Sequence, residues 1–141
     1  MMMSDVIDER IQPLVATMNT CGFNTFASCE GHGFPADSRL PYVAFYCDIM
    51  AAARLEALLR ADAESLNPKL NWGWTITGTF NSAGELGFAM RPTRPHLILH
   101  RYLRRFLVDD FAKLGNLLLQ DRKSKGHVDI PLSDAPEKIN G

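Results

Sequence analysis

The chain has 141 residues, of which 46% are hydrophobic and 22% charged, and its formal net charge is -1. These are ordinary values for one folded domain, so they argue against disorder, and no run approaches the roughly 18 apolar residues of a membrane span. The first residues lack the basic and apolar regions of a signal peptide. Cys21, Cys29 and Cys47 are too few for a disulfide scaffold. We therefore expect a soluble, cytoplasmic protein with reduced thiols.

Apolar periodicity and turn residues predict the elements in chain order. Pro13 lies inside the first helical pattern, so we expect either a kink there or a helix that begins nearer Gln12. The expected elements are a helix over 5–20, a strand over 23–28, a loop over 34–41, a strand over 41–48, a helix over 49–66, a hairpin of strands 71–80 and 86–92, a helix over 98–120 and a last strand over 127–132.

Residues 41–132 thus follow the order strand–helix–strand–strand–helix–strand, which is typical of a ferredoxin-like split βαβ core. The predicted fold is α/β (α+β), with this core preceded by an extra N-terminal helix and strand. We expect a single domain over 1–133 and a flexible tail over 134–141. In the hairpin, Trp72 and Trp74 share one face and are expected to be core, although a sheet can also display aromatic rings to RNA bases.

The stretch "TFASCEGHGFP" (25–35) gathers Ser28, Cys29, Glu30 and His32 just after a predicted strand. One hypothesis is a nucleophilic Cys29 with His32 as its base and Glu30 nearby. A weaker one is a metal site on Cys29 and His32, because the C-x-x-H spacing suits two zinc ligands. A four-ligand site would need two partners, either Cys21 and Cys47 or His96 and His100. The remaining interpretation is a structural turn in which the glycines supply positive φ.

Charge is distributed unevenly along the chain. Residues 1–90 carry a net charge of -5 and residues 91–125 a net charge of +6. The segment "RPTRPHLILHRYLRR" (91–105) holds five arginines, two histidines and no acid. Such density favours phosphate or nucleic-acid contact over a merely solvated helix face. The candidate ligand-binding residues are Arg91, Arg94, His96, His100, Arg101, Arg104 and Arg105, the last four within an arc of roughly 140° if they lie on one helix.

The segment "IQPLVATMNTCGFNTFASCEGHG" (11–33) resembles the opening of the wybutosine-synthesis tRNA methyltransferase family. Asn19, Thr25, Ser28, Cys29 and Gly31 match its helix–strand–loop pattern, and the segment that includes Leu99 and His100 is more loosely similar. Two departures are His32, where the family has a basic residue, and a shorter chain. The resemblance implies S-adenosylmethionine as cofactor, a modified guanosine in tRNA as substrate, and the matched residues at the ligand site.

The leading hypothesis is therefore a protein that binds an anionic nucleotide-type ligand or RNA where the 28–32 loop meets the basic segment, with possible RNA methylation by resemblance. In an enzyme of this kind, Cys29, Glu30 and His32 are the candidate catalytic residues, and His32 or Glu30 would take the acceptor's proton. The alternative is a non-catalytic interaction or nucleic-acid-binding accessory protein whose 28–32 loop is structural.

Overall fold

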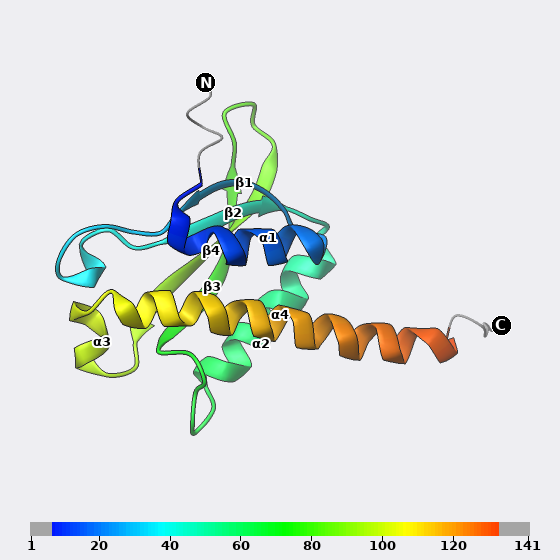
Figure 1. Cartoon of the computed structure of the whole chain (residues 1–141). Coiled ribbons are helices and arrows are strands. Elements are labelled where there is room, and N and C mark those ends of the chain that lie inside the picture. Colours follow the sequence, from blue (N-terminus) through cyan, green and yellow to red (C-terminus); the bar gives the residue numbers. More distant parts are fainter. Residues whose placement is uncertain (1–6, 133–141) are drawn as a thin grey trace.

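The computed structural model describes residues 7–132, which form a four-stranded antiparallel sheet and a layer of helices (Figure 1). The α+β class predicted from the sequence is therefore confirmed. In chain order the elements are the 3-10 turn η2 (Glu9–Ile11), α1 (Gln12–Thr20), β1 (Asn24–Cys29), the 3-10 turn η3 (Ala36–Ser38), β2 (Tyr42–Tyr46), α2 (Ile49–Ala63), β3 (Trp72–Phe80), β4 (Leu86–Pro95), α3 (Ile98–Tyr102) and α4 (Arg105–Leu132).

The strand order is β1-β2-β4-β3, and every neighbouring pair is antiparallel. Strand β4 therefore lies between β2 and β3, which is the split βαβ arrangement expected for the middle of the chain. The complete ferredoxin-like core is not formed as predicted. Residues 127–132 belong to helix α4 rather than to a last strand, and β1 occupies the sheet edge next to β2.

The error at 127–132 has a physical reason. A run of six residues is too short to separate a period of 2 from a period of 3.6. A strand also needs an edge to pair with, and α4 carries the chain away from the sheet instead (Figure 1). The proposed tail, 134–141, lies outside the described residues.

The predicted helix over 98–120 is also wrong in its continuity. It is divided into α3 and α4, and Leu103 between them has extended backbone angles, φ -102° and ψ 118°. The break turns Arg101 and Arg104 towards the loop that follows β1, where both form hydrogen bonds. The single helical arc expected for His100, Arg101, Arg104 and Arg105 is therefore not present.

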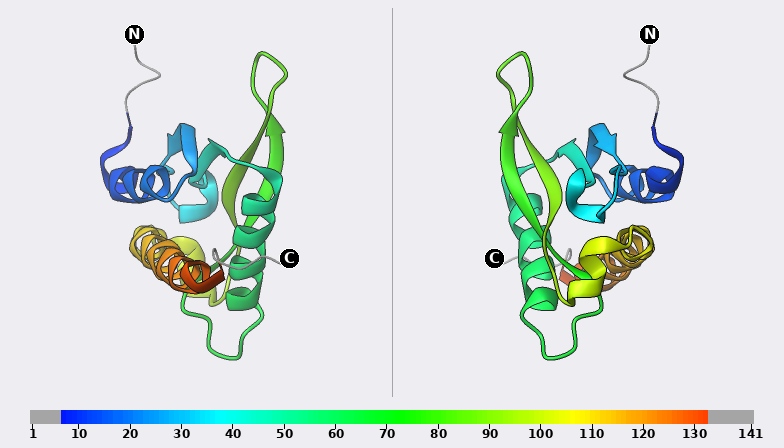
Figure 2. Two further views of the ribbon diagram at one scale, coloured as in Figure 1. Left: turned by 90° about the vertical axis from the view of Figure 1, so that its right-hand side faces the viewer. Right: turned by 90° about the vertical axis from the view of Figure 1, so that its left-hand side faces the viewer.

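One hydrophobic core joins the sheet to the helices. Helices α1 and α4 lie together over the sheet, and α2 runs beside the β3–β4 hairpin (Figure 2). Trp72 and Trp74 are 1% and 3% exposed, so their predicted core position is confirmed. The other core side chains come from η2, α1, η3, β2, α2, β4, α4 and the segment before β3: Ile11, Leu14, Val15, Met18, Ala36, Val43, Phe45, Leu55, Leu59, Leu70, Met90, Leu107, Phe111, Leu114 and Leu118.

A buried carboxylate fastens α4 to the start of β3. Asp110 is completely inaccessible to solvent. Its Oδ1 accepts a hydrogen bond from the backbone N–H of Asn71 at 2.7 Å. Its Oδ2 accepts one from the backbone N–H of Trp72 at 3.0 Å and one from the indole Nε1–H of Trp74 at 2.9 Å. These bonds fix where the core helix meets the two core tryptophans.

This carboxylate predicts a pH dependence of stability. Burial raises the pKa of Asp110 from 3.8 to about 6, against the opposing effect of its N–H donors. A group with a raised folded-state pKa binds its proton more tightly when folded, so its contribution falls as pH rises from about 4 to about 6 and then stays constant. The expected decrease is on the order of 3 kcal/mol. Urea unfolding between pH 4 and 7 measures this decrease. A contribution of Asp110 to the free energy of unfolding that increases over this interval would contradict the prediction.

Candidate functional site

The loop after β1 is held in place by hydrogen bonds to two other segments, the N-terminal segment before α1 and the segment before β2. The N–H of Glu30 donates to Asp8 Oδ2 at 3.0 Å, and Glu30 Oε1 accepts from the N–H of Arg10 at 2.8 Å. The N–H of His32 donates to the carbonyl of Arg39 at 3.1 Å. The loop therefore has one defined shape, and its side chains are positioned by the N-terminal segment before α1 as well as by β1.

Arginines of the basic segment meet this loop. Arg104 Nη2 donates to the carbonyl oxygens of Gly33 and Ala36, both at 3.0 Å, and Arg101 Nε donates to Asp37 Oδ2 at 2.7 Å. Burial lowers the pKa of Arg104, although the guanidinium keeps its charge. The two features singled out in the sequence are therefore neighbours, but these two guanidinium groups are engaged with the protein itself.

The three candidate catalytic residues lie together at the end of β1. Cys29 is half-buried, and its Sγ accepts a hydrogen bond from the N–H of Gly31 at 3.3 Å. The His32 side chain is 59% exposed, and its Nε2 lies 4.0 Å from Asp8 Oδ2. Glu30 accepts the hydrogen bond from Arg10 described above. Asp8 was missed by the sequence interpretation, because it lies 21 positions before Cys29 and only the fold brings them together.

The other residues of the matched motif are more dispersed. Asn19 Nδ2 donates to Thr25 Oγ1, and the N–H of Thr25 donates back to Asn19 Oδ1. This reciprocal pair ties the end of α1 to the start of β1, at the opposite end of that strand from Cys29. Ser28 lies in β1 opposite Val43. Gly31 has φ +86°, and the space behind its Cα is closed by Arg104 and by the carbonyl of Arg39.

The histidines of the basic segment are turned inwards. His100 is 8% exposed, and its Nδ1 lies 2.9 Å from the carbonyl oxygen of Asn71. His96 is half-buried, and its Nε2 is a buried atom without a hydrogen-bond partner among the described residues. Neither histidine approaches Cys29 and His32 to complete the metal set considered from the sequence.

The remaining arginines point in different directions. Arg91 and Arg94 are exposed on β4, and the Arg91 guanidinium lies 5.3 Å from the ring centre of Tyr42. Arg105 is exposed at the start of α4, with its guanidinium 5.0 Å from the ring of Phe106. The predicted basic patch is thus dispersed over the end of the sheet and the start of α4.

Aromatic side chains gather on the face of the sheet that points away from the core. On β2, Val43 and Phe45 face the core, so Tyr42 and Tyr46 point the other way. Phe26 stands at a bulge in β1 and stacks on Tyr46, with ring centres 4.3 Å apart. We call Phe26, Tyr42, Tyr46 and Arg91 the open face. The sequence did not reveal it, because the bulge shifts the alternation of β1.

Gly87 makes the stack on the open face possible. A Cβ at this position would lie 3.0 Å from Phe26 Cε2 and 3.2 Å from Tyr46 Cε1. Phe26 is 38% exposed, and Tyr42 and Tyr46 are half-buried. The hydroxyl of Tyr46 also accepts a hydrogen bond from Asn81 of the β3–β4 turn. The rings are therefore held at fixed positions while part of their surface meets solvent.

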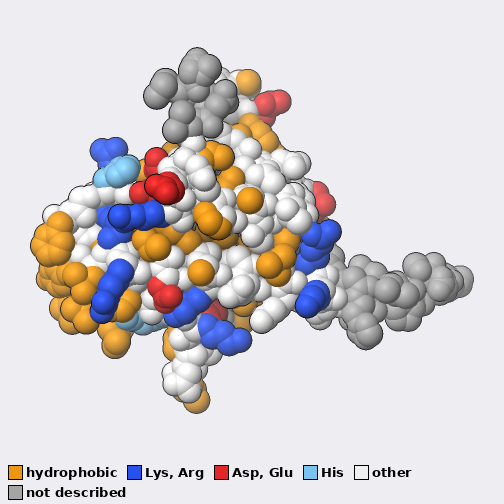
Figure 3. Space-filling view, viewed as in Figure 1, with side chains coloured by type: hydrophobic (Ala, Val, Ile, Leu, Met, Phe, Trp, Pro, Cys, Tyr) orange, Lys and Arg blue, Asp and Glu red, His pale blue; other side chains and the backbone are white. Residues whose placement is uncertain are grey.

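A second exposed surface lies around α3. Hydrophobic side chains gather at this end of the molecule, with basic side chains beside them (Figure 3). We call this surface the α3 patch, and its members are Phe34, Leu97, Ile98, Leu99 and Tyr102, exposed by 74%, 62%, 74%, 52% and 37%. Contiguous apolar surface of this kind often marks an interaction site.

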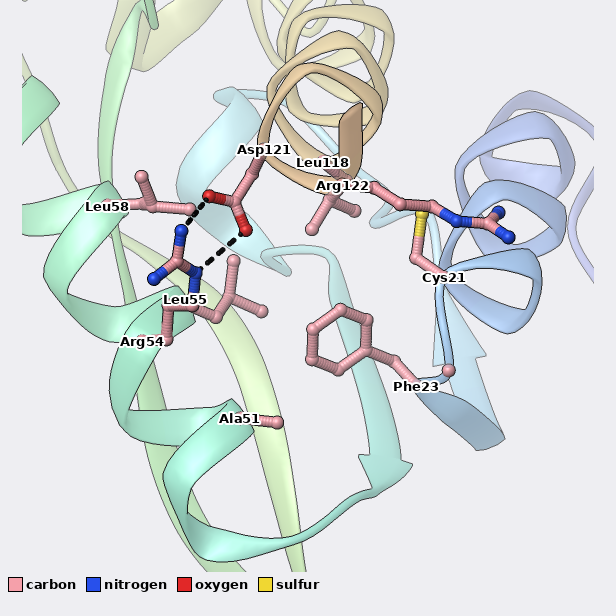
Figure 4. Close-up of a pocket in the computed structure, with 10 residues that line it drawn as sticks. Cys21, Phe23, Ala51, Arg54, Leu55, Leu58, Leu118, Asp121 and Arg122 are labelled. Carbon is pink, nitrogen blue, oxygen red and sulfur yellow. Dashed lines mark hydrogen bonds and ion pairs between the residues drawn. The ribbon is translucent and has the colours of Figure 1, made fainter. Parts of the chain in front are cut away.

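A small pocket lies between the end of α1, α2 and α4 (Figure 4). Its volume is about 120 Å³, below the roughly 300–1,000 Å³ typical of ligand pockets. Arg54 and Asp121 form two hydrogen bonds at its mouth, of 3.1 and 2.7 Å, and Arg122 donates to the carbonyl of Thr20. The pocket includes Cys21, which was considered for the metal set, but none of the candidate catalytic or ligand-binding residues. The loop after β1 and the open face therefore remain the candidate site.

Comparisons with protein-family models, with curated proteins and with solved structures gave no match. The similarity of residues 11–33 to the tRNA methyltransferase family therefore stays a prediction. None of the helices within residues 7–132 is long and apolar enough to cross a lipid bilayer.

Proposed function

We propose that the protein binds an anionic nucleotide-type ligand or single-stranded RNA on the open face, next to the loop at 28–32. The observation that carries this proposal is the arrangement of Tyr42 and Arg91. The guanidinium lies 5.3 Å from the ring centre, and Tyr42 is directly opposite Cys29 in the register of β1 and β2. A ring that can stack a base thus lies beside a cation that can contact a phosphate and beside the candidate loop.

Stacking on aromatic rings can hold a nucleic acid whatever its base sequence. Each base has a flat π-face, and stacking on an aromatic side chain contributes about 1–3 kcal/mol per base. The paired rings of Phe26 and Tyr46 offer a second platform, four residues along β2 from Tyr42. Four residues of strand span ~13 Å, so one ligand of more than one nucleotide would contact both platforms.

The finer form of the proposal is S-adenosylmethionine-dependent RNA modification, which rests on the resemblance of residues 11–33. In such a reaction the protein mainly aligns donor and acceptor. His32 is the better acid–base candidate because its side chain is exposed, whereas Glu30 already accepts a backbone N–H of Arg10. All three cysteines are free, which is compatible with the reducing cytosol that we propose as its location.

A non-catalytic interaction protein is the second candidate, and the α3 patch favours it. Five apolar side chains are exposed there, and Arg101 stands beside Tyr102 with its guanidinium 5.7 Å from the ring. In that case the loop would be a structural turn that presents Phe34, and mutations on the open face would leave partner binding unchanged.

Binding of a labelled single-stranded RNA, followed by fluorescence anisotropy, tests the proposal. We expect Tyr42→Leu to weaken binding about tenfold through lost stacking. Arg91→Met should weaken binding and reduce the slope of log affinity against log salt by about one, because one phosphate contact is lost. The control is Arg60→Met, which removes an exposed arginine paired with Glu56 on α2.

Equal affinities of the wild type and both open-face variants would overturn the proposal, as would a loss confined to Arg60→Met. A thermal-shift screen with S-adenosylmethionine, S-adenosylhomocysteine and nucleotides tests the finer form separately, because a ligand that binds only the folded state raises the midpoint of unfolding. If the protein binds RNA but neither S-adenosylmethionine nor S-adenosylhomocysteine raises the unfolding midpoint, the binding proposal stands and the methyltransferase proposal is contradicted.

A further inference from the structure

Three side chains of metal-ligating type converge beside the loop at 28–32. The ligand atoms of Asp8, Cys29 and His32 all lie within 4.8 Å of one another. They come from two segments far apart in the sequence, and hydrogen bonds fix both segments relative to each other. Oδ2 of Asp8 is held by the N–H of Glu30 at 3.0 Å, so the carboxylate cannot turn away without breaking that bond.

The turn between Cys29 and His32 has the geometry that two ligands three residues apart require. The N–H of Gly31 donates to Cys29 Sγ at 3.3 Å, and Gly31 adopts φ +86°. This backbone bond fixes the position of the sulfur, which is a soft ligand for metal ions. The positive φ reverses the chain, so that His32 returns to the side of Cys29.

The distances are close to those of a tetrahedral site. Ligands at 2.0–2.3 Å from zinc lie roughly 3.3–3.8 Å apart. His32 Nε2 and Asp8 Oδ2 are already 4.0 Å apart, and the largest separation in the group is below 4.8 Å. To reach the separations found around zinc, the three ligand atoms therefore need to move by about an ångström or less. The His32 side chain is 59% exposed and free of tight packing, so it can make that movement.

We propose that Asp8, Cys29 and His32 bind one zinc ion, with the fourth coordination position open to solvent. A set of one oxygen, one sulfur and one nitrogen suits a borderline-soft ion such as zinc and does not suit magnesium or calcium, which take oxygen ligands. Three protein ligands with one open position distinguish a site that handles a water or substrate from a closed structural site. Zinc binding would occupy His32, so it replaces the acid–base role proposed for that side chain, and it is otherwise independent of the open face.

Titration of the reduced, tag-free protein with Co²⁺ tests the proposal. We expect one equivalent to give intense visible bands of tetrahedral cobalt and a thiolate-to-cobalt charge-transfer band in the near ultraviolet, both removed by added Zn²⁺. Cys29→Ser should abolish the charge-transfer band. His32→Ala should lower the affinity at least tenfold while the circular dichroism spectrum stays unchanged, because its side chain is exposed.

The matched control is Cys47→Ser. Cys47 is half-buried against the core, and burial raises its pKa to about 11, so it should contribute nothing to metal binding. A wild-type spectrum without a thiolate band would overturn the assignment. So would a band that persists in Cys29→Ser or disappears in Cys47→Ser, and so would an unchanged affinity in His32→Ala.

Discussion

Replacing Asp110 by alanine is expected to lower the free energy of unfolding at pH 7 by about 2–4 kcal/mol. The substitution leaves three N–H donors, those of Asn71, Trp72 and the Trp74 indole, without their acceptor. Each buried unsatisfied donor costs about 1–3 kcal/mol, and removal of the buried charge offsets part of this loss. A domain of this kind has about 5–15 kcal/mol of stability in total, so the effect is large.

The neighbouring Asp109→Ala is the matched control for this prediction. Its carboxylate is 52% exposed and contacts Lys113 at 2.8 Å, so its loss should cost no more than about 1 kcal/mol. Urea unfolding followed by tryptophan fluorescence measures both variants. The folded state binds the proton of Asp110 more tightly than the unfolded state does, so Asp110 stabilises the fold more at lower pH. The loss of unfolding free energy caused by Asp110→Ala should therefore grow as pH falls from 7 towards 5. Equal penalties for the two variants would show that the three hydrogen bonds contribute little.

Gly31→Ala is expected to have the second large effect, a loss of about 2–4 kcal/mol together with displacement of the loop. A Cβ there would lie 2.5 Å from Arg104 Nη1 and 2.7 Å from the carbonyl oxygen of Arg39. Arg104 is held by its two bonds to the loop, and the Arg39 carbonyl by its bond from His32. Neither neighbour can yield cheaply, and the φ of +86° adds about 1–2 kcal/mol of backbone strain.

The control Gly22→Ala separates steric crowding of the added Cβ from backbone strain at positive φ. Gly22 has a similar φ of +94°, but an added Cβ would meet no atom within 4 Å. It should therefore show only the backbone strain, about 1–2 kcal/mol. Thermal and urea unfolding of the two variants give the difference that is due to crowding alone. Indistinguishable stabilities would mean that the packing of Arg104 behind the loop is dispensable.

The sequence predicted those elements whose pattern is long and self-consistent. The alternation around Trp72 and Trp74 identified the hairpin and its buried side. Pro13 indicated either a kink or a helix start near Gln12, and α1 begins at Gln12. Local chemistry decides these features, so no knowledge of the rest of the fold was needed. The break at Leu103 is different, because bonds from Arg101 and Arg104 to the distant loop accompany it.

The candidate site could be predicted only in part for the same reason. The 28–32 loop was recognisable from its reactive side chains and glycines, and its contact with the basic segment was expected. Asp8 joins it only through the backbone of Glu30, and the open face depends on a bulge in β1 that moves Phe26 onto Tyr46. Both features arise from the tertiary structure, and the local sequence pattern does not predict them. The arginines also differ in role, since Arg104 braces the loop and Arg91 meets solvent on the sheet.

The most direct test of ligand binding on the open face is a backbone amide NMR titration with a short single-stranded RNA. We predict that the largest chemical-shift changes fall on the strand residues around Tyr42 and Arg91 and on the loop from Ser28 to His32, with little change around Arg54 and Asp121 in the small pocket. Changes confined to that pocket or to the α3 patch, or no changes at RNA concentrations that saturate known single-strand binders, would contradict the account.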